Sequence, residues 1–382
     1  MTTGPKQGPR FDIADIVRAH RARLGRSTRL SPQQRRVLTD IAQCRTAVLG
    51  GHVDRCTGCG HEHPAYNSCR NRHCPKCQAL AQEKWIAERR ARMLDVKHFH
   101  VVFTVPAELR ALAAFAPREV FGALFRCAQS TLTEFGESRL EAMIGATLVL
   151  HTWTRDLRFH PHVHAIVTGG GLSRDGQRWC AVGAKFLFPV RAMSRVLCGK
   201  MLTELRKLYD HGAFLAFDDF RDPEAFDRLA RRLAGTSWNV YAKPSFDTGE
   251  NVLAYLGRYT HRVGIANSRL LAVSTDAVTF RTKGSGTATM APVDFLRRFI
   301  RHVLPDGFHK IRHIGLYASA AVDKLALARH ALCMRPTRPC ALTWRERLTQ
   351  VTGRDVGRCP LCSAEVRSIP VVRSRDPPRR AA

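Results

Sequence analysis

Apolar and polar residues alternate with two different spacings along this chain, so the pattern predicts both strands and helices. Short β-branched and aromatic runs predict strands at 99–106, 147–154 and 162–170, with the last two forming a β-hairpin, and further strands at 269–276 and 277–284. Apolar residues three or four positions apart predict helices that begin near Ser31-Pro32 and that cover 81–94, 107–141, 193–212, 222–235, 251–264 and 292–304. The elements mix without regular strand–helix–strand alternation, which favours an α+β fold with an antiparallel sheet.

The excess of basic over acidic residues indicates the kind of partner that the protein binds. The chain carries 61 Lys and Arg against 32 Asp and Glu, a formal net charge of +29 spread along its length. Such an excess is typical of proteins that bind a polyanion, and nucleic acid is the polyanion it favours. No run of 18 apolar residues and no signal peptide are found, so we expect a cytoplasmic protein with no membrane partner.

Paired cysteines predict a structural zinc site. Cys56-x-x-Cys59 is followed after fourteen residues by Cys74-x-x-Cys77. Two thiolates in each tight turn can grip one ion, and four complete a tetrahedral site that leaves no position open for chemistry. Basic residues lie between these ligands, so we expect the module to touch phosphates through Arg70, Arg72 and Lys76.

Other cysteines and histidines suggest further metal sites. A second zinc site is predicted from the remaining ligands of the same stretch: Cys44, His52, Cys69 and His73. A third pair, Cys359-x-x-Cys362, lies far downstream, and its nearest partners in sequence are Cys333 and Cys340. Cys333 and Cys340 lack the close spacing of a paired zinc ligand, so no site is predicted for Cys359 and Cys362.

Three histidines at every second position predict a different kind of metal site. In HPHVHAIV, His162 and His164 point to one face of a strand, as does His160 if the strand begins that early. His151 lies on the neighbouring strand, and the turn of the hairpin can bring it beside the pair. A single buried histidine is usually structural, but this grouping favours a metal, with zinc, nickel or manganese suited to imidazole better than magnesium.

Two tyrosines supply a candidate nucleophile. Tyr255 and Tyr259 are four residues apart on a predicted helix and share one face, while Arg258 and Arg262 share another and are expected to contact DNA. An amphipathic helix would also bury tyrosines in this way. Beside a metal site and a basic surface, a phenol activated near a metal-bound phosphate is the interpretation we favour.

Together these motifs resemble the rolling-circle transposases of the insertion sequence 91 type, members of the HUH endonuclease superfamily. The resemblance covers roughly residues 40–320 and rests on four segments. YNSCRNRHCPKC is similar to the zinc-binding domain, HVVFTVP with LHTW and HPHVHAIV to the catalytic palm, YLGRYTHR to the two-tyrosine helix, and RRFIRHVLPDGFHKIRHIGL to a downstream block.

The resemblance implies a specific chemistry. A Mg or Mn ion would be held by His162 and His164 of the His–apolar–His motif and by a third ligand. The relaxase branch of the superfamily takes that ligand from the preceding strand, which corresponds to His151 here, and His160 is the alternative. Tyr255 and Tyr259 match the family's tyrosine pair, although some relatives keep only one.

We therefore expect a bacterial, nucleoid-associated transposase that nicks and rejoins single-stranded transposon-end DNA through a phosphotyrosine intermediate. No phosphate-binding loop of a helicase motor occurs, so host replication proteins are expected partners for strand opening. One alternative is a plasmid-type replication initiator or relaxase with the same chemistry. Another, from a different class, is a non-catalytic zinc-finger regulator, which leaves the histidines and tyrosines unexplained.

These motifs suggest four consecutive parts. They are a basic N-terminal segment (1–35), a zinc-binding domain with a linker helix (36–95), an HUH-type catalytic domain with an antiparallel sheet and flanking helices (96–330), and a basic C-terminal tail (331–382). We expect the last ten residues of that tail, RSRDPPRRAA, to be disordered because they are basic and rich in proline.

Overall fold

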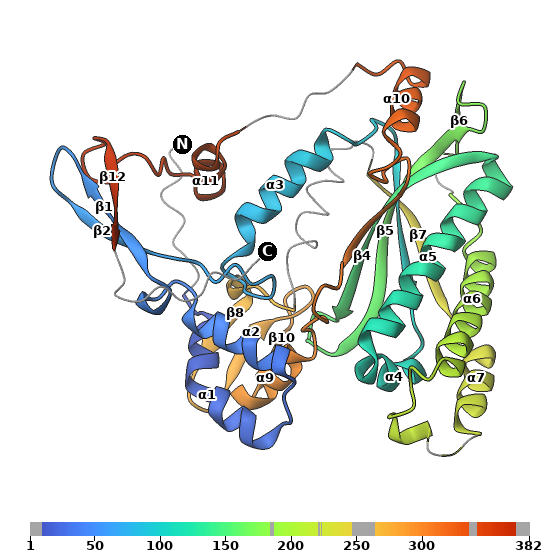
Figure 1. Ribbon diagram of the computed structural model, residues 1–382, viewed down its shortest axis with the longest axis horizontal. Coiled ribbons are helices and arrows are strands. Elements are labelled where there is room, and N and C mark those ends of the chain that lie inside the picture. The colour runs from blue at the N-terminus through green and yellow to red at the C-terminus, as the bar shows by residue number, and fades with distance from the viewer. Residues whose placement is uncertain are drawn as a thin grey trace. The chain divides into compact units, whose positions relative to one another are not determined.

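The structure of the protein is a computed structural model that describes residues 10–183, 187–220, 222, 224–246, 264–335 and 342–371 (Figure 1). It divides into two compact units. The first unit combines Met1–Lys84, His261–Val303 and Cys340–Ala382, and the second combines Trp85–Thr260 and Leu304–Pro339. This division differs from the four consecutive parts expected from the sequence, because segments far apart in the chain fold together within each unit.

The second unit is built on an antiparallel sheet, which confirms the predicted α+β class. Its strands are β3 (His98–Thr104), β4 (Ala142–Trp153), β5 (Phe159–Ser173), β6 (Trp179–Ala181), β7 (Asn239–Phe246) and β11 (Ile311–Gly315). They lie in the order β11-β4-β5-β3-β7, with β6 paired to β5. The predicted β4–β5 hairpin is present, but β7 and β11 join the sheet from later parts of the chain and were not predicted.

Helices cover one face of this sheet. They are α4 (Arg110–Phe115), α5 (Pro117–Leu140), α6 (Val190–Asp210) and α7 (Ala225–Gly235), and Figure 1 shows them together on one side of the strands. The helix predicted at 107–141 is broken before Pro117, whose ring cannot continue the preceding helix. Alternate residues of the strands, such as Phe99, Val101 and Phe103, are fully buried against these helices.

Among the described residues, the opposite face of the sheet is only partly covered. At one end, Val149 and Ile166 pack with Leu316, Tyr317 and residues of α10 (Val322–Ala331) in a separate small cluster. Because side chains alternate across a strand, the residues between the core positions of β3, β4 and β5 all point to this face. The predicted metal-binding histidines are among them.

The first unit contains a helical core and two small sheets. Its helices are α1 (Ile13–Ser27), α2 (Pro32–Gln43), α9 (Pro292–Ile300) and α11 (Trp344–Thr352), and β8 (Leu270–Val273), β9 (Val278–Arg281) and β10 (Thr287–Met290) form one sheet. The predicted start of α2 is confirmed, since Ser31 and Gln34 form a capping box. Helix α1 buries Ile13, Ile16 and Val17, so the basic N-terminal segment contributes to the core.

The second small sheet of this unit joins distant parts of the chain. Strand β1 (Gly51–Cys56) pairs with β2 (Glu62–Tyr66) on one side and with β12 (Val366–Val371) on the other. Strand β12 lies in the stretch predicted as a C-terminal tail. The basic end of that tail, 373–382, lies outside the described residues, as do 251–263 of the predicted tyrosine helix.

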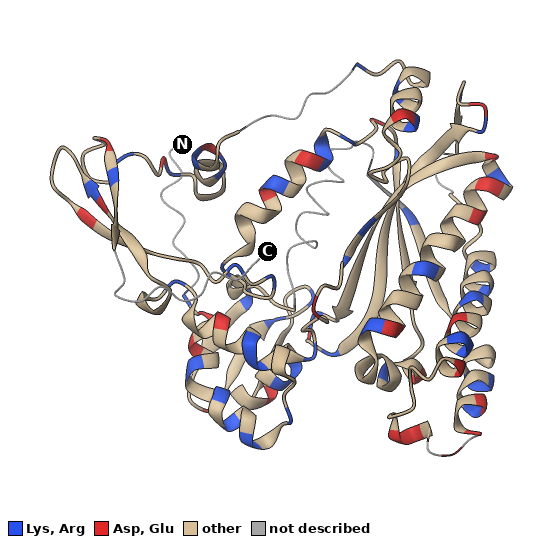
Figure 2. Cartoon of the chain, viewed as in Figure 1, with Lys and Arg blue, Asp and Glu red and all other residues tan. Residues whose placement is uncertain are grey.

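Basic side chains are distributed over both units instead of one tail, as expected from the sequence (Figure 2). Helix α3 (Gln78–Arg90) begins in the first unit and ends in the second, and carries several of them. Within the part of the chain that the structure describes, no helix has the length and apolar character needed to cross a membrane.

Candidate functional site

The β4–β5 hairpin places three histidines on one face of the sheet. His151 of β4 lies directly opposite His162 of β5, and His164 follows two residues later on the same face. One ring nitrogen from each of the three lies within 4.8 Å of the others. The predicted grouping of His151 with His162 and His164 is therefore present in the structure.

Burial favours the neutral form of His162 and His164. Removal from water lowers the pKa of His162 to about 4 and that of His164 well below its usual value, with the charge of neighbouring histidines adding to the effect on His164. His151 is 4% exposed. A neutral imidazole keeps a lone pair for a metal, so His162 and His164 have the protonation state that metal binding requires.

Hydrogen bonds determine which ring nitrogen of His162 and of His164 is available to a metal ion. The Nδ1 atom of His162 lies 2.6 Å from the carbonyl oxygen of His160. A carbonyl only accepts, so Nδ1 carries the proton and Nε2 has the lone pair. The side chain of His160, the alternative third ligand, is used elsewhere, because its Nδ1 atom lies 3.0 Å from the Arg110 guanidinium.

His100 of β3 was missed by the sequence analysis. Its Nε2 atom lies 2.7 Å from Nδ1 of His164, and the two rings are stacked with an interplanar angle of 1°. This contact leaves Nε2 of His164 for a metal, so His100 holds the ligand in the required tautomer and orientation. The signal was in the sequence, since His98 and His100 repeat the His-x-His spacing in a neighbouring strand.

We expect His100→Ala to weaken binding of Mn²⁺ about 10- to 100-fold, the effect usual for an outer partner of a ligating histidine. His100→Gln should retain most of the affinity, because its amide oxygen can accept a hydrogen bond from Nδ1–H of His164. Isothermal titration calorimetry of the two variants measures this difference. Equal affinity of His100→Ala and the unmodified protein would contradict a positioning role.

Eight cysteines form two four-thiol clusters, and the pairing differs from the predicted one. Cys74 and Cys77 lie with Cys44 and Cys69, whereas Cys56 and Cys59 lie with Cys359 and Cys362. The predicted site of Cys56, Cys59, Cys74 and Cys77 is therefore corrected. Each pair was recognised properly, but the turn that follows β1 carries Cys56 and Cys59 toward the segment next to β12 instead of toward Cys74.

The first cluster is compact and belongs wholly to the N-terminal part of the chain. The Cys77 Sγ atom lies 3.2 Å from that of Cys44 and 3.5 Å from that of Cys69. Hydrogen bonds from the neighbouring thiols, that of Cys44 first, hold the pKa of Cys77 far below its usual value. The cluster thus favours a thiolate even before a cation binds, which suits zinc.

The two histidines predicted for the second zinc site lie outside both clusters. His73 is buried, and its Nδ1 atom lies 3.0 Å from the side-chain oxygen of Asn71. His52 lies on β1 with its Nε2 atom 3.3 Å from a carboxylate oxygen of Asp54. Of the four predicted ligands, only Cys44 and Cys69 are brought together, and they share their cluster with Cys74 and Cys77.

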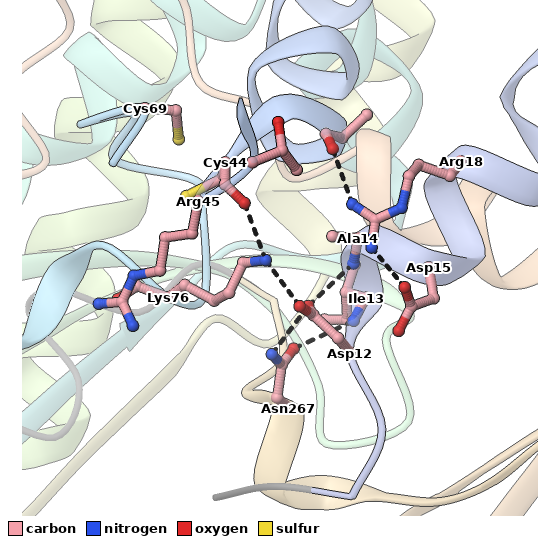
Figure 3. Close-up of polar contacts among 12 residues, drawn as sticks. Asp12, Ile13, Ala14, Asp15, Arg18, Cys44, Arg45, Cys69, Lys76 and Asn267 are labelled. Atoms are coloured by element: carbon pink, nitrogen blue, oxygen red, sulfur yellow. Dashed lines mark hydrogen bonds and ion pairs between the residues drawn. The ribbon is translucent and has the colours of Figure 1, made fainter. Parts of the chain in front are cut away.

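Lys76 is used inside the first unit instead of on its surface. Its ammonium donates to the Cys44 carbonyl at 3.1 Å and pairs with Asp12 at 2.7 Å (Figure 3). Asp12 caps α1 through the Ala14 N–H and also accepts from the Asn267 side chain at 2.9 Å. This ammonium therefore links the first cysteine cluster to α1, and its predicted phosphate contact stays a prediction.

The other residues predicted to contact DNA differ in exposure or lie outside the described part of the chain. Arg70 is exposed and Arg72 is half-buried. Arg258, Arg262, Tyr255 and Tyr259 lie outside the described residues, so their roles stay predictions.

Comparison with known proteins gives the class. A family model described as "Putative transposase" matches residues 145–324, which contain the histidine triad, and one described as "Transposase zinc-binding domain" matches residues 16–105. The chain is 43% identical over 374 residues to "Putative transposase y4qJ" of Sinorhizobium fredii (strain NBRC 101917 / NGR234), with 94% of each chain covered. It is 29% identical over 347 residues to "Transposase for insertion sequence element IS801" of Pseudomonas savastanoi pv. phaseolicola, with 86% of this chain and 82% of that one covered. No solved structure gives a significant match.

The histidine triad on an antiparallel sheet and the cysteine clusters of a zinc-binding domain are thus those of a transposase. The chain belongs to the insertion sequence 91 family of transposases, with the zinc-binding domain of that family at its N-terminal side. Membership in this family implies that the protein binds DNA.

Proposed function

We propose that this transposase nicks and rejoins single-stranded transposon-end DNA through a phosphotyrosine intermediate, with a divalent cation held by His151, His162 and His164. The observation that carries the proposal is the convergence of three imidazoles on one sheet face. Three nitrogen ligands leave coordination positions for a phosphate oxygen and water. A bound cation there would supply charge to a non-bridging phosphate oxygen.

The bonds that form and break belong only to a phenol and a phosphodiester. A Tyr255 or Tyr259 oxygen forms a bond to phosphorus, and the bond from phosphorus to the 3′ oxygen breaks. The phenol proton ends on that oxygen as a 3′-hydroxyl, and the 5′-phosphate stays on the protein. Attack of a new 3′-hydroxyl reverses these steps and joins the strands, so neither oxidation nor an energy source is needed.

Residues beside the triad support binding of a single strand. On the edge strand β7, Tyr241 shares the row of Val102 and His164, and Lys243 shares that of His100, so both point to the same face as the triad. Tyr241 is 50% exposed and Lys243 is exposed. An exposed aromatic ring and a cation two residues apart suit a stacked base and its phosphate.

The direct test mixes the full-length protein with a labelled single-stranded oligonucleotide of a transposon end and Mn²⁺ or Mg²⁺. We expect a shortened product with a free 3′-hydroxyl and an equal amount of protein-linked DNA on a denaturing gel, both absent in EDTA. Specific binding without any cleavage at either metal would favour the non-catalytic regulator instead.

A further inference from the structure

We propose that Cys56, Cys59, Cys359 and Cys362 hold a second structural zinc ion, which clasps a segment near the end of the chain to the zinc-binding domain. This site is independent of the proposed strand-transfer chemistry. It also lies partly outside the recognised domain, because the zinc-binding match ends at residue 105 and contains only the first two of these ligands.

The sulfur atoms have the separations of a tetrahedral thiolate site. The Sγ atoms of Cys56 and Cys362 lie 3.3 Å apart, and those of Cys59 and Cys359 lie 3.7 Å apart. All four lie within 4.8 Å of one another. A tetrahedron with Zn–S bonds of 2.3 Å has edges of about 3.8 Å, whereas a disulfide requires about 2.05 Å.

Both cysteine pairs form the same kind of turn. The N–H groups of Gly58 and Cys59 point to Sγ of Cys56 at 3.3 and 3.4 Å. In the other pair the N–H group of Leu361 points to Sγ of Cys359 at 3.4 Å. Backbone donors aimed at a sulfur stabilise its thiolate form, which is the form that binds zinc.

The sheet around this cluster has no hydrophobic core of its own. Within the described stretches 51–66 and 354–371, the only buried residues are Cys56 and Cys359. Apolar side chains such as Ile369 and Val371 are 43% and 54% exposed. A three-stranded sheet without a core is marginal in water, so a metal is the source of stability that this arrangement requires.

Backbone contacts fix the two halves of the site in register. Cys56 lies opposite Val366 in the β1–β12 pairing, and the next residue, Thr57, donates from its N–H to the Glu365 carbonyl at 3.0 Å. Gly58 faces Ala364 so closely that an added Cβ would lie 2.8 Å from that side chain. The turn that carries Cys56 and Cys59 therefore fits closely against the turn that carries Cys359 and Cys362.

Native mass spectrometry of the full-length protein, purified without chelators, counts the zinc ions directly. We expect two ions per chain, and one ion in the double variant Cys359→Ser with Cys362→Ser. The double variant Cys56→Ser with Cys59→Ser should also hold one. A variant with all four changes should still hold one, because the four residues serve a single site.

Matched controls test whether the loss of one zinc ion is specific to these four cysteines. Cys180→Ser with Cys333→Ser, which alters two cysteines outside both clusters, should keep two ions. Cys362→His keeps a zinc ligand at its position and should also retain two, which covers the case of serine variants that fail to fold. One ion in the unmodified protein, two ions after the Cys359 and Cys362 changes, or a disulfide among these residues would overturn the proposal.

Discussion

Tyr255→Phe combined with Tyr259→Phe is expected to abolish the covalent protein–DNA adduct on single-stranded end DNA while leaving its binding affinity unchanged. Phenylalanine keeps the ring and removes only the hydroxyl, so the change tests chemistry without opening a cavity. The measurement is a denaturing gel with labelled oligonucleotide, followed by mass spectrometry of the DNA-linked peptide. An adduct that persists in this variant, or that maps outside 255–259, would identify a different nucleophile.

The single variants report the order of the two transfers. If the predicted helix at 251–264 forms, residues four apart on it place their hydroxyls about one turn, roughly 5–6 Å, from each other, so both cannot be aligned equally with one phosphate. We therefore expect one single variant to lose first-strand cleavage completely and the other to lose only the second transfer. Similar partial activity in both would mean that the tyrosines are interchangeable.

His162→Ala and His164→Ala are expected to weaken Mn²⁺ binding at least about 100-fold, since even outer partners of such ligands are worth 10- to 100-fold. Cleavage should fall about 1,000-fold or more, because a metal at the scissile phosphate contributes several kcal/mol. Single-strand binding should persist, since basic side chains supply most of that affinity through phosphate contacts. Calorimetry, cleavage rates and gel shifts measure the three effects separately.

His160→Ala is the matched control for the third ligand. His160 touches His162 through its backbone carbonyl and through its ring, at a centroid distance of 5.1 Å, but it is not part of the cluster of three ligand atoms. Its replacement should therefore preserve most of the metal affinity, whereas His151→Ala should reduce it as strongly as His162→Ala. The reverse result would move the third ligand from β4 to the start of β5.

The histidine centre was predictable from the sequence because its geometry is local. A strand alternates its side chains, and a short turn fixes the register between His151 and His162, so the spacing along the chain already determines the site. His100 adds a neighbour from β3, and its place depends on a β3–β5 pairing that no short-range pattern defines. Helices α5, α6 and α7 of the second unit followed apolar spacing, apart from the break that Pro117 imposes, whereas α10 was not predicted.

The zinc ligands were predictable as pairs but not as sites. A Cys-x-x-Cys turn is local, whereas the choice of its partner pair depends on tertiary structure. Cys56 and Cys362 are separated by 306 positions, and nothing near either one in sequence indicates the other. The same limit applies to β12, whose exposed residues lack a period, and to Lys76, whose partner Asp12 belongs to a distant helix.

Pairing of β1 with β12 imposes an order of events during protein synthesis. About 300 residues separate β2 from β12, so at 5–20 residues per second the ribosome needs roughly 15–60 s to supply the missing strand. During that interval the thiols of Cys56 and Cys59 have been synthesised but Cys359 and Cys362 have not. The first pair is then open to oxidation or to binding of another metal ion. A chain that terminates early, by a nonsense mutation or a frameshift, never completes its N-terminal sheet. The three-stranded sheet and the proposed zinc site of Cys56, Cys59, Cys359 and Cys362 can therefore form only after residues 354–371 have been synthesised.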